Sequence, residues 1–124
     1  MTIDLKQIKY FDVARKLSYK SDYHHKLGAV IVNKNKIVGL GFNKPNKTHT
    51  KSNHPFKTIH AKLDAMLGVS RENLKGATIY IYREHKNGSP LIAKPCKHCQ
   101  ELIRMAEIKY VCYTSNGTYI KEKL

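Results

Sequence analysis

Three side chains able to hold a metal ion lie in two short segments of the 124-residue chain. His60 lies near the start of the first segment, and Cys96 and Cys99 form a Cys-x-x-Cys pair in the second. Imidazole nitrogen and thiolate sulfur are ligands that Zn²⁺ prefers, and a catalytic zinc keeps three protein ligands and leaves its fourth position to water. The sequence therefore predicts an open zinc site held by His60, Cys96 and Cys99.

Helices are expected to carry these ligands. Apolar residues recur at helical spacing and predict helices over residues 4–17, 58–67 and 96–107. Thr58 is expected to cap the second helix, with His60 in its first turn. Both cysteines fall in the first turn of the third helix, where the helix dipole favours thiolate. Asp64, one turn after His60, is interpreted as a surface or capping residue rather than a group that orients a ligand.

Short β-rich runs predict five strands, over residues 27–32, 37–43, 77–82, 110–114 and 118–121. Asparagine-containing turns make hairpins of the first two and the last two strands. Glycines Gly39 and Gly41 would let a ligand or another backbone approach the second strand. Polar loops are expected over residues 44–57 and 83–94. The element order predicts one domain, 1–124, with a three-layer α/β fold: a mixed five-stranded sheet, helices on both faces and a final antiparallel hairpin.

The formal net charge of +14 comes mainly from lysine, because the chain has only four arginines. Such a charge favours a polyanion partner, either nucleic acid or a phosphorylated small molecule. Lysines scattered along the chain are also typical of a solvated surface, so the charge leaves the partner open. No run approaches the length of a membrane span, and the N-terminal residues lack the apolar core of a secretory signal. Three cysteines without a disulfide framework indicate a reducing, cytoplasmic location.

The segments His60-Ala61-Lys62 and Pro95-Cys96-Lys97-His98-Cys99 resemble the His-x-Glu and Pro-Cys-x-x-Cys signature of the zinc-dependent cytidine and deoxycytidylate deaminases. The resemblance implies a cytidine deaminase-like fold, one zinc per chain and hydrolytic removal of the amino group from a cytosine base. It also implies that Asn43 contacts the sugar and that the backbone around Ala61 contacts the base edge.

The substrate would then be cytidine, deoxycytidine or its nucleotide, or a cytosine in single-stranded nucleic acid. An adenine base in place of cytosine stays an open alternative. The final hairpin resembles the branch of the family that includes free-nucleoside cytidine deaminases, whereas the charge favours a phosphate-bearing substrate. A homo-oligomer is expected only by analogy with those relatives.

Lys62 departs from this signature, because it stands where the family carries its general acid/base glutamate. An ammonium accepts no proton until it loses one, and its unperturbed pKa is about 10.4. Loss of a general acid/base typically lowers the rate by about 10²- to 10⁴-fold. We therefore expect a chain that binds zinc and deaminates poorly or not at all. Either an active deaminase has received an inactivating change, which we favour, or Lys62 binds phosphate or a carboxylate in a natural non-enzyme.

The alternative function is a non-catalytic, zinc-containing module that binds nucleic acid. A closed structural zinc site needs a fourth protein ligand, for which His54, His98 and Cys112 are the candidates. Cys112 is otherwise expected to be a core thiol in the middle of a strand. Four tyrosines alternate along the strands and are expected to pack in the core rather than stack on bases: Tyr80, Tyr82, Tyr113 and Tyr119.

Overall fold

A mixed five-stranded sheet runs through the protein, in the order β2-β1-β5-β6-β7. The structure is a computed structural model that describes residues 5–20, 25–45, 58–59, 61–85, 97–115 and 118–124. The strands of the sheet are β1 (His25–Asn33), β2 (Lys36–Phe42), β5 (Thr78–His85), β6 (Tyr110–Ser115) and β7 (Thr118–Lys123). β1 is antiparallel to β2 and β5, β6 is parallel to β5, and β7 is antiparallel to β6. The predicted mixed sheet and its final hairpin are confirmed.

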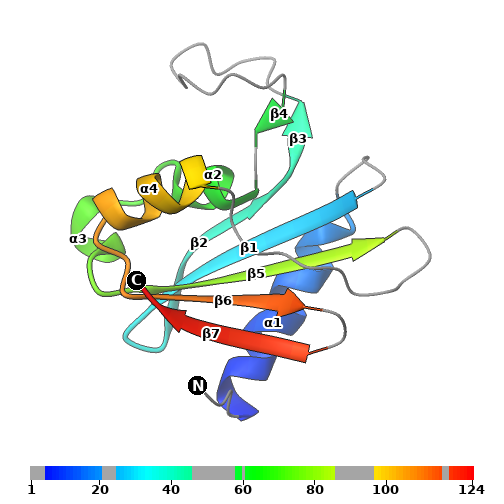
Figure 1. Cartoon of the computed structure of the whole chain (residues 1–124), viewed down its shortest axis with the longest axis horizontal. Coiled ribbons are helices and arrows are strands. Elements are labelled where there is room, and N and C mark those ends of the chain that lie inside the picture. The colour runs from blue at the N-terminus through cyan, green and yellow to red at the C-terminus, as the bar shows by residue number, and fades with distance from the viewer. Residues whose placement is uncertain (1–4, 21–24, 46–57, 60, 86–96, 116–117) are drawn as a thin grey trace.

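Helices cover both faces of the sheet (Figure 1). One face carries α1 (Leu5–Ser18), and the other carries α2 (Ala61–Met66), α3 (Arg71–Leu74) and α4 (Lys97–Met105). Each face has its own core, because side chains alternate along a strand. Ile79 and Ile81 of β5 pack in the core under α2, α3 and α4, whereas Tyr80 and Tyr82 pack in the core under α1. The predicted three-layer arrangement is confirmed.

Glycines let two helices lie directly on the sheet. A Cβ at Gly41 would overlap the backbone of Ala61 and Ala65 in α2, and a Cβ at Gly28 would overlap the backbone of Ala14 in α1. Glycine is the one residue that permits so close a backbone approach. Of the two explanations for glycine in the second strand, a neighbouring backbone is therefore the one that the structure supports.

The start of the second helix differs from the prediction. Thr58–Ile59 form a two-residue strand, β4, that pairs antiparallel with β3 (Lys44–Pro45), and α2 begins only at Ala61. Thr58 is therefore not an N-cap. The β-branched side chains of this dipeptide favour a strand, and its pairing partner lies too far back in the sequence for a local pattern to reveal it.

The third predicted strand is longer than expected. β5 continues through Arg83 to His85, where it pairs with the start of β1, and Leu27 lies opposite Arg83. The prediction that the chain leaves the sheet at Arg83 was wrong, because the ladder with β1 supplies backbone partners to residues whose side chains are polar. Among the helices that the structure describes, none is long and apolar enough to cross a membrane.

Candidate metal centre

The N-terminus of α2 points toward the end of the sheet where β2 finishes. Ala61, at the start of the helix, lies beside Gly41, whereas Val69, beyond its end, lies beside Gly39. The backbone N–H of Phe42 donates a 3.1 Å hydrogen bond to Oδ2 of Asp64. Asp64 therefore ties α2 to β2 and is not the surface or capping residue that the sequence indicated.

The N-terminus of α4 points toward the same end. Beyond its C-terminus, the N–H of Lys109 donates to the carbonyl of Ala77 at 2.8 Å, just before β5 begins. Ile103 of α4 packs in the same core as Ala61 of α2, so α4 runs back over the sheet from there. We call the end at which α2 and α4 begin, formed by the finish of β2 and β5 and the start of β1, the site end of the sheet.

Cys99 is the one predicted zinc ligand that falls on described residues. It lies in the first turn of α4 and is only 1% exposed. His60 and Cys96 lie outside the described residues, one position before α2 and α4 respectively. Across the described part of the chain, no three His, Cys, Asp or Glu side chains lie close enough together to hold a metal. One imidazole and two thiolates suit Zn²⁺, and a thiol shielded from water at a helix N-terminus fits that donor set.

Asn43 lies at the site end and is 8% exposed. Its Oδ1 accepts a 3.0 Å hydrogen bond from the N–H of Leu27, and its own N–H donates to the Leu27 carbonyl at 3.3 Å. The side chain is thus fixed by β1, and its contact with a sugar stays a prediction. Ala61 and Lys62 are the first two residues of α2. Ala61 is fully buried, and the side chain of Lys62 lies outside the described residues.

Cys112 cannot be the fourth ligand of a closed zinc site. It packs with Phe11 and Tyr80 in the core under α1, on the opposite face of the sheet from α4. Burial raises the pKa of the Cys112 thiol to about 12, against a smaller lowering by Lys121, so the thiol stays protonated at neutral pH. The interpretation as a core thiol is confirmed. Of the other two candidates, His54 and the side chain of His98 lie outside the described residues.

Arg83 is a charged residue at the site end that the sequence did not single out. It pairs with Leu27, and its backbone N–H donates to Oγ1 of Thr114 at 3.2 Å. The alternation of Ile79, Ile81 and Arg83 along β5 is the signal that predicts its face.

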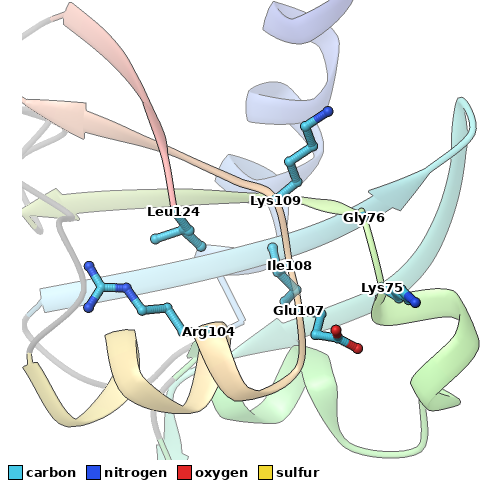
Figure 2. Close-up of a pocket in the computed structure, with 7 residues that line it drawn as sticks. All are labelled: Lys75, Gly76, Arg104, Glu107, Ile108, Lys109 and Leu124. Atoms are coloured by element: carbon cyan, nitrogen blue, oxygen red, sulfur yellow. The ribbon is translucent and has the colours of Figure 1, made fainter.

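A pocket of about 440 Å³ lies at the opposite end of the sheet, beside the C-terminus of α4 (Figure 2). Its three cationic side chains, Lys75, Arg104 and Lys109, point away from one another rather than toward a common centre. Cations at a helix C-terminus complement the negative end of the helix dipole. This pocket therefore has a structural explanation, and it lacks the converging polar groups of a binding site.

The chain is similar to curated deaminases over most of its length. It is 31% identical over 112 residues to the deoxycytidylate deaminase of Homo sapiens, covering 77% of this chain and 56% of that one. It is 28% identical to the deoxycytidylate deaminase of Mycobacterium phage D29, covering 84% of this chain and 90% of that one. The chain therefore spans just over half the length of the human relative.

Solved structures share the fold. The dCMP deaminase of cyanophage S-TIM5 superposes with a TM-score of 0.62 at 23% identity, covering 93% of this chain and 86% of that one. The cytidine deaminase of Burkholderia pseudomallei superposes with a TM-score of 0.64 at 19% identity, covering 99% and 93%. The sequence profile described as the cytidine and deoxycytidylate deaminase zinc-binding region matches residues 5–115. The chain therefore belongs to the cytidine and deoxycytidylate deaminase family.

Proposed function

We propose that this chain is a zinc-dependent hydrolytic deaminase domain for a cytosine base, in which Lys62 suppresses the chemical step. The observation that carries the proposal is that α2 and α4 begin at the same end of the sheet, with Cys99 buried in the first turn of α4. His60, Cys96 and Cys99 would hold one zinc ion, which would act as a Lewis acid and lower the pKa of a water molecule to near neutral pH.

The remaining groups at the site end bind and orient the substrate. Asn43, fixed against β1, contacts the sugar, and the backbone at Ala61, where α2 begins, contacts the base edge. We propose a deoxycytidine nucleotide, rather than free cytidine, as the substrate. Two similarities support this choice: the phage and mammalian relatives are named deoxycytidylate deaminases, and the cyanophage enzyme was solved in complex with dCMP and dUMP. Cysteines without a disulfide framework are typical of a reducing compartment, for which we propose the cytoplasm. A homo-oligomer is part of the proposal by analogy alone.

Lys62 is the reason to expect weak activity. The family signature places a carboxylate there to take a proton from the zinc-bound water and deliver it to the base. A protonated lysine can donate a proton but cannot accept one. The positive charge of Zn²⁺ nearby favours the neutral form of the lysine, which can accept a proton but has none to donate as an acid. Both proton transfers are therefore impaired together.

The test is to compare the native chain with Lys62→Glu for zinc content and for deamination of cytidine, deoxycytidine, dCMP and a single-stranded oligodeoxynucleotide. Both proteins should hold one zinc, and Lys62→Glu should be faster by about 10²- to 10⁴-fold on at least one substrate. Lys75→Glu makes the same charge change at an exposed position at the other end of the sheet and should not raise the rate.

A zinc-loaded Lys62→Glu protein that deaminates none of these substrates would contradict the enzyme proposal. X-ray absorption that finds four protein ligands on the zinc would instead support the non-catalytic zinc module.

A further inference from the structure

Three residues form a row across the site end of the sheet: Asn43 after β2, Leu27 in β1 and Arg83 in β5. Leu27 is hydrogen-bonded to Asn43 on one side and lies opposite Arg83 on the other. Leu27 packs against the core under α2 and α4, and residues opposite each other in antiparallel strands share a face. The side chain of Arg83 therefore lies on the face that carries Cys99.

The backbone around Arg83 is held from both sides. Its strand pairs with β1, and its N–H donates to Oγ1 of Thr114, a fully buried residue of β6. The side chain is half-buried, and its Nε is shielded from solvent. An arginine on a rigid strand is better placed to select a ligand than one on a loop, because its guanidinium starts from a fixed position.

We infer that Arg83 binds the 5′-phosphate of the substrate and is the residue by which this site distinguishes a nucleoside monophosphate from a free nucleoside. The inference rests on the proposed function. A guanidinium presents parallel N–H donors that match two phosphate oxygens, which is the strongest form of charge-assisted hydrogen bond in proteins. The net charge of +14 attracts such an anion over longer distances.

The row also has a suitable span. One strand, β1, separates Asn43 from Arg83, so their backbones lie two strand spacings apart, about 10 Å. A nucleotide whose sugar contacts Asn43 can therefore place its 5′-phosphate within reach of the long side chain of Arg83. The pocket of Figure 2 offers no comparable arrangement, because its cations diverge and lie at a helix C-terminus.

The first experiment measures binding to the zinc-loaded native chain, where Lys62 limits turnover. Calorimetric titrations with dCMP and deoxycytidine should give a dissociation constant for dCMP that is lower by on the order of 10- to 100-fold. Arg83→Gln should remove this difference and change the affinity for deoxycytidine by no more than about twofold. Arg83→Lys keeps the charge without the two parallel donors and should give an intermediate ratio.

Arg104→Gln is the matched control, because Arg104 is an exposed arginine of α4 that lines the pocket at the other end (Figure 2). It removes the same charge and should leave the ratio of the two affinities unchanged. Melting temperatures of all variants identify any loss of fold, and the ratio of affinities is independent of a uniform loss of active protein. An unchanged ratio in Arg83→Gln overturns the inference. So does failure of the native chain to bind either ligand, or tighter binding of a short oligodeoxynucleotide than of dCMP.

The second experiment repeats the comparison for turnover in the Lys62→Glu background, and it separates this inference from the proposed function. Arg83→Gln should lower kcat/KM for dCMP by on the order of 10- to 100-fold, mainly through KM, and leave kcat/KM for deoxycytidine unchanged. Equal turnover of both substrates regardless of Arg83 overturns the inference and keeps the deaminase. Absence of turnover, together with Arg83-dependent binding of dCMP, overturns the deaminase and keeps Arg83 as a phosphate-binding residue.

Discussion

The two faces of the sheet each bury a cysteine, but only Cys99 lies at the start of a helix. Cys112 sits in the middle of β6, among aromatic and aliphatic side chains that face α1. Cys99 sits in the first turn of α4, whose N-terminus points to the site end. Burial in an apolar core favours the neutral thiol, whereas a helix N-terminus favours thiolate. The same residue type is thus a packing element on one face and a candidate metal ligand on the other.

The faces also differ in what their helices do. α1 is a long helix whose buried side fills the space over β1 and β5, where Phe11 lies against Tyr80 and Tyr119. α2 and α4 are shorter, and each begins at the site end. We expect changes under α1 to affect stability alone, and changes under α2 and α4 to affect stability and zinc binding together. Four predictions follow from this division, in order of decreasing effect.

The largest effect is expected from truncating one core residue on each face. Phe11 and Ile103 are each 1% exposed. Phe11→Ala should lower the free energy of unfolding by about 3–5 kcal/mol, and Ile103→Ala by about 2–5 kcal/mol, measured by urea denaturation. At a temperature where both variants are folded, only Ile103→Ala should also weaken zinc binding, because Ile103 lies one turn from Cys99. Equal zinc affinities in both variants would show that the two faces are not separate in function.

The two cysteines allow a more direct comparison. Cys99→Ser should weaken zinc binding by at least about 100-fold, since changes to groups that merely orient a ligand already cost 10- to 100-fold. Cys112→Ser should keep the zinc and lose stability instead, by about 1–3 kcal/mol, because its hydroxyl is buried in an apolar core. Competition with a chromophoric chelator measures both affinities. Loss of zinc from Cys112→Ser would contradict the assignment of the two thiols to different faces.

The stability of the protein should depend on Cys112 at alkaline pH. The pKa of this thiol is raised from 9.0 to about 12 in the fold, so only the unfolded chain ionises it readily as the pH rises above 9. The contribution to stability is full below pH 9 and is lost between pH 9 and about 12, by at most about 1.4 kcal/mol per pH unit.

Urea denaturation of the native chain and of Cys112→Ala across this range measures the effect. The native chain should lose stability more steeply than Cys112→Ala. The pKa of Tyr113 is also raised, by burial and by Glu122, but that contribution is common to both proteins and cancels in the difference. If the free energy of unfolding falls equally with pH in the two proteins, the Cys112 thiol is not shielded from solvent in the fold.

The smallest effect is expected at Asp64. Asp64→Asn keeps an oxygen that can accept from the N–H of Phe42 but removes its charge, which should cost about 1 kcal/mol. Asp12→Asn makes the same change at an exposed position of α1 and should stay within about 0.5 kcal/mol of the native chain. Equal stabilities of the two variants would show that the carboxylate does not hold α2 on β2.

The sequence predicted the sheet well because its central strands are buried and rich in β-formers. The apolar run in β1 and the alternating run in β5 carry that signal in their own residues. The ends of elements were less predictable, because they depend on partners elsewhere in the chain. β5 extends through Arg83 because β1 pairs with it, and Thr58 is a strand residue because Lys44–Pro45 lie opposite.

Dependence on distant parts of the chain also limits what could be predicted of the site. The types and spacing of His60, Cys96 and Cys99 indicated zinc without any knowledge of the fold, and those ligands stay a prediction apart from the placement of Cys99. The orientation of α2 and α4 toward one end of the sheet is a tertiary property. The face of Arg83 was available from its alternation with Ile79 and Ile81, but a polar strand end was interpreted as a loop.

The short pairing of β3 with β4 has a consequence for how this fold changes in evolution and engineering. Pro45 and Thr58, which flank residues 46–57 in the sequence, lie opposite each other in this pairing. The entropy of closing a loop grows only with the logarithm of its length, so each doubling costs about 0.6 kcal/mol. The intervening segment can therefore be exchanged for another of different length without disturbing the sheet. A cassette exchanged between two deaminases at this junction would therefore keep the paired framework of β3 and β4.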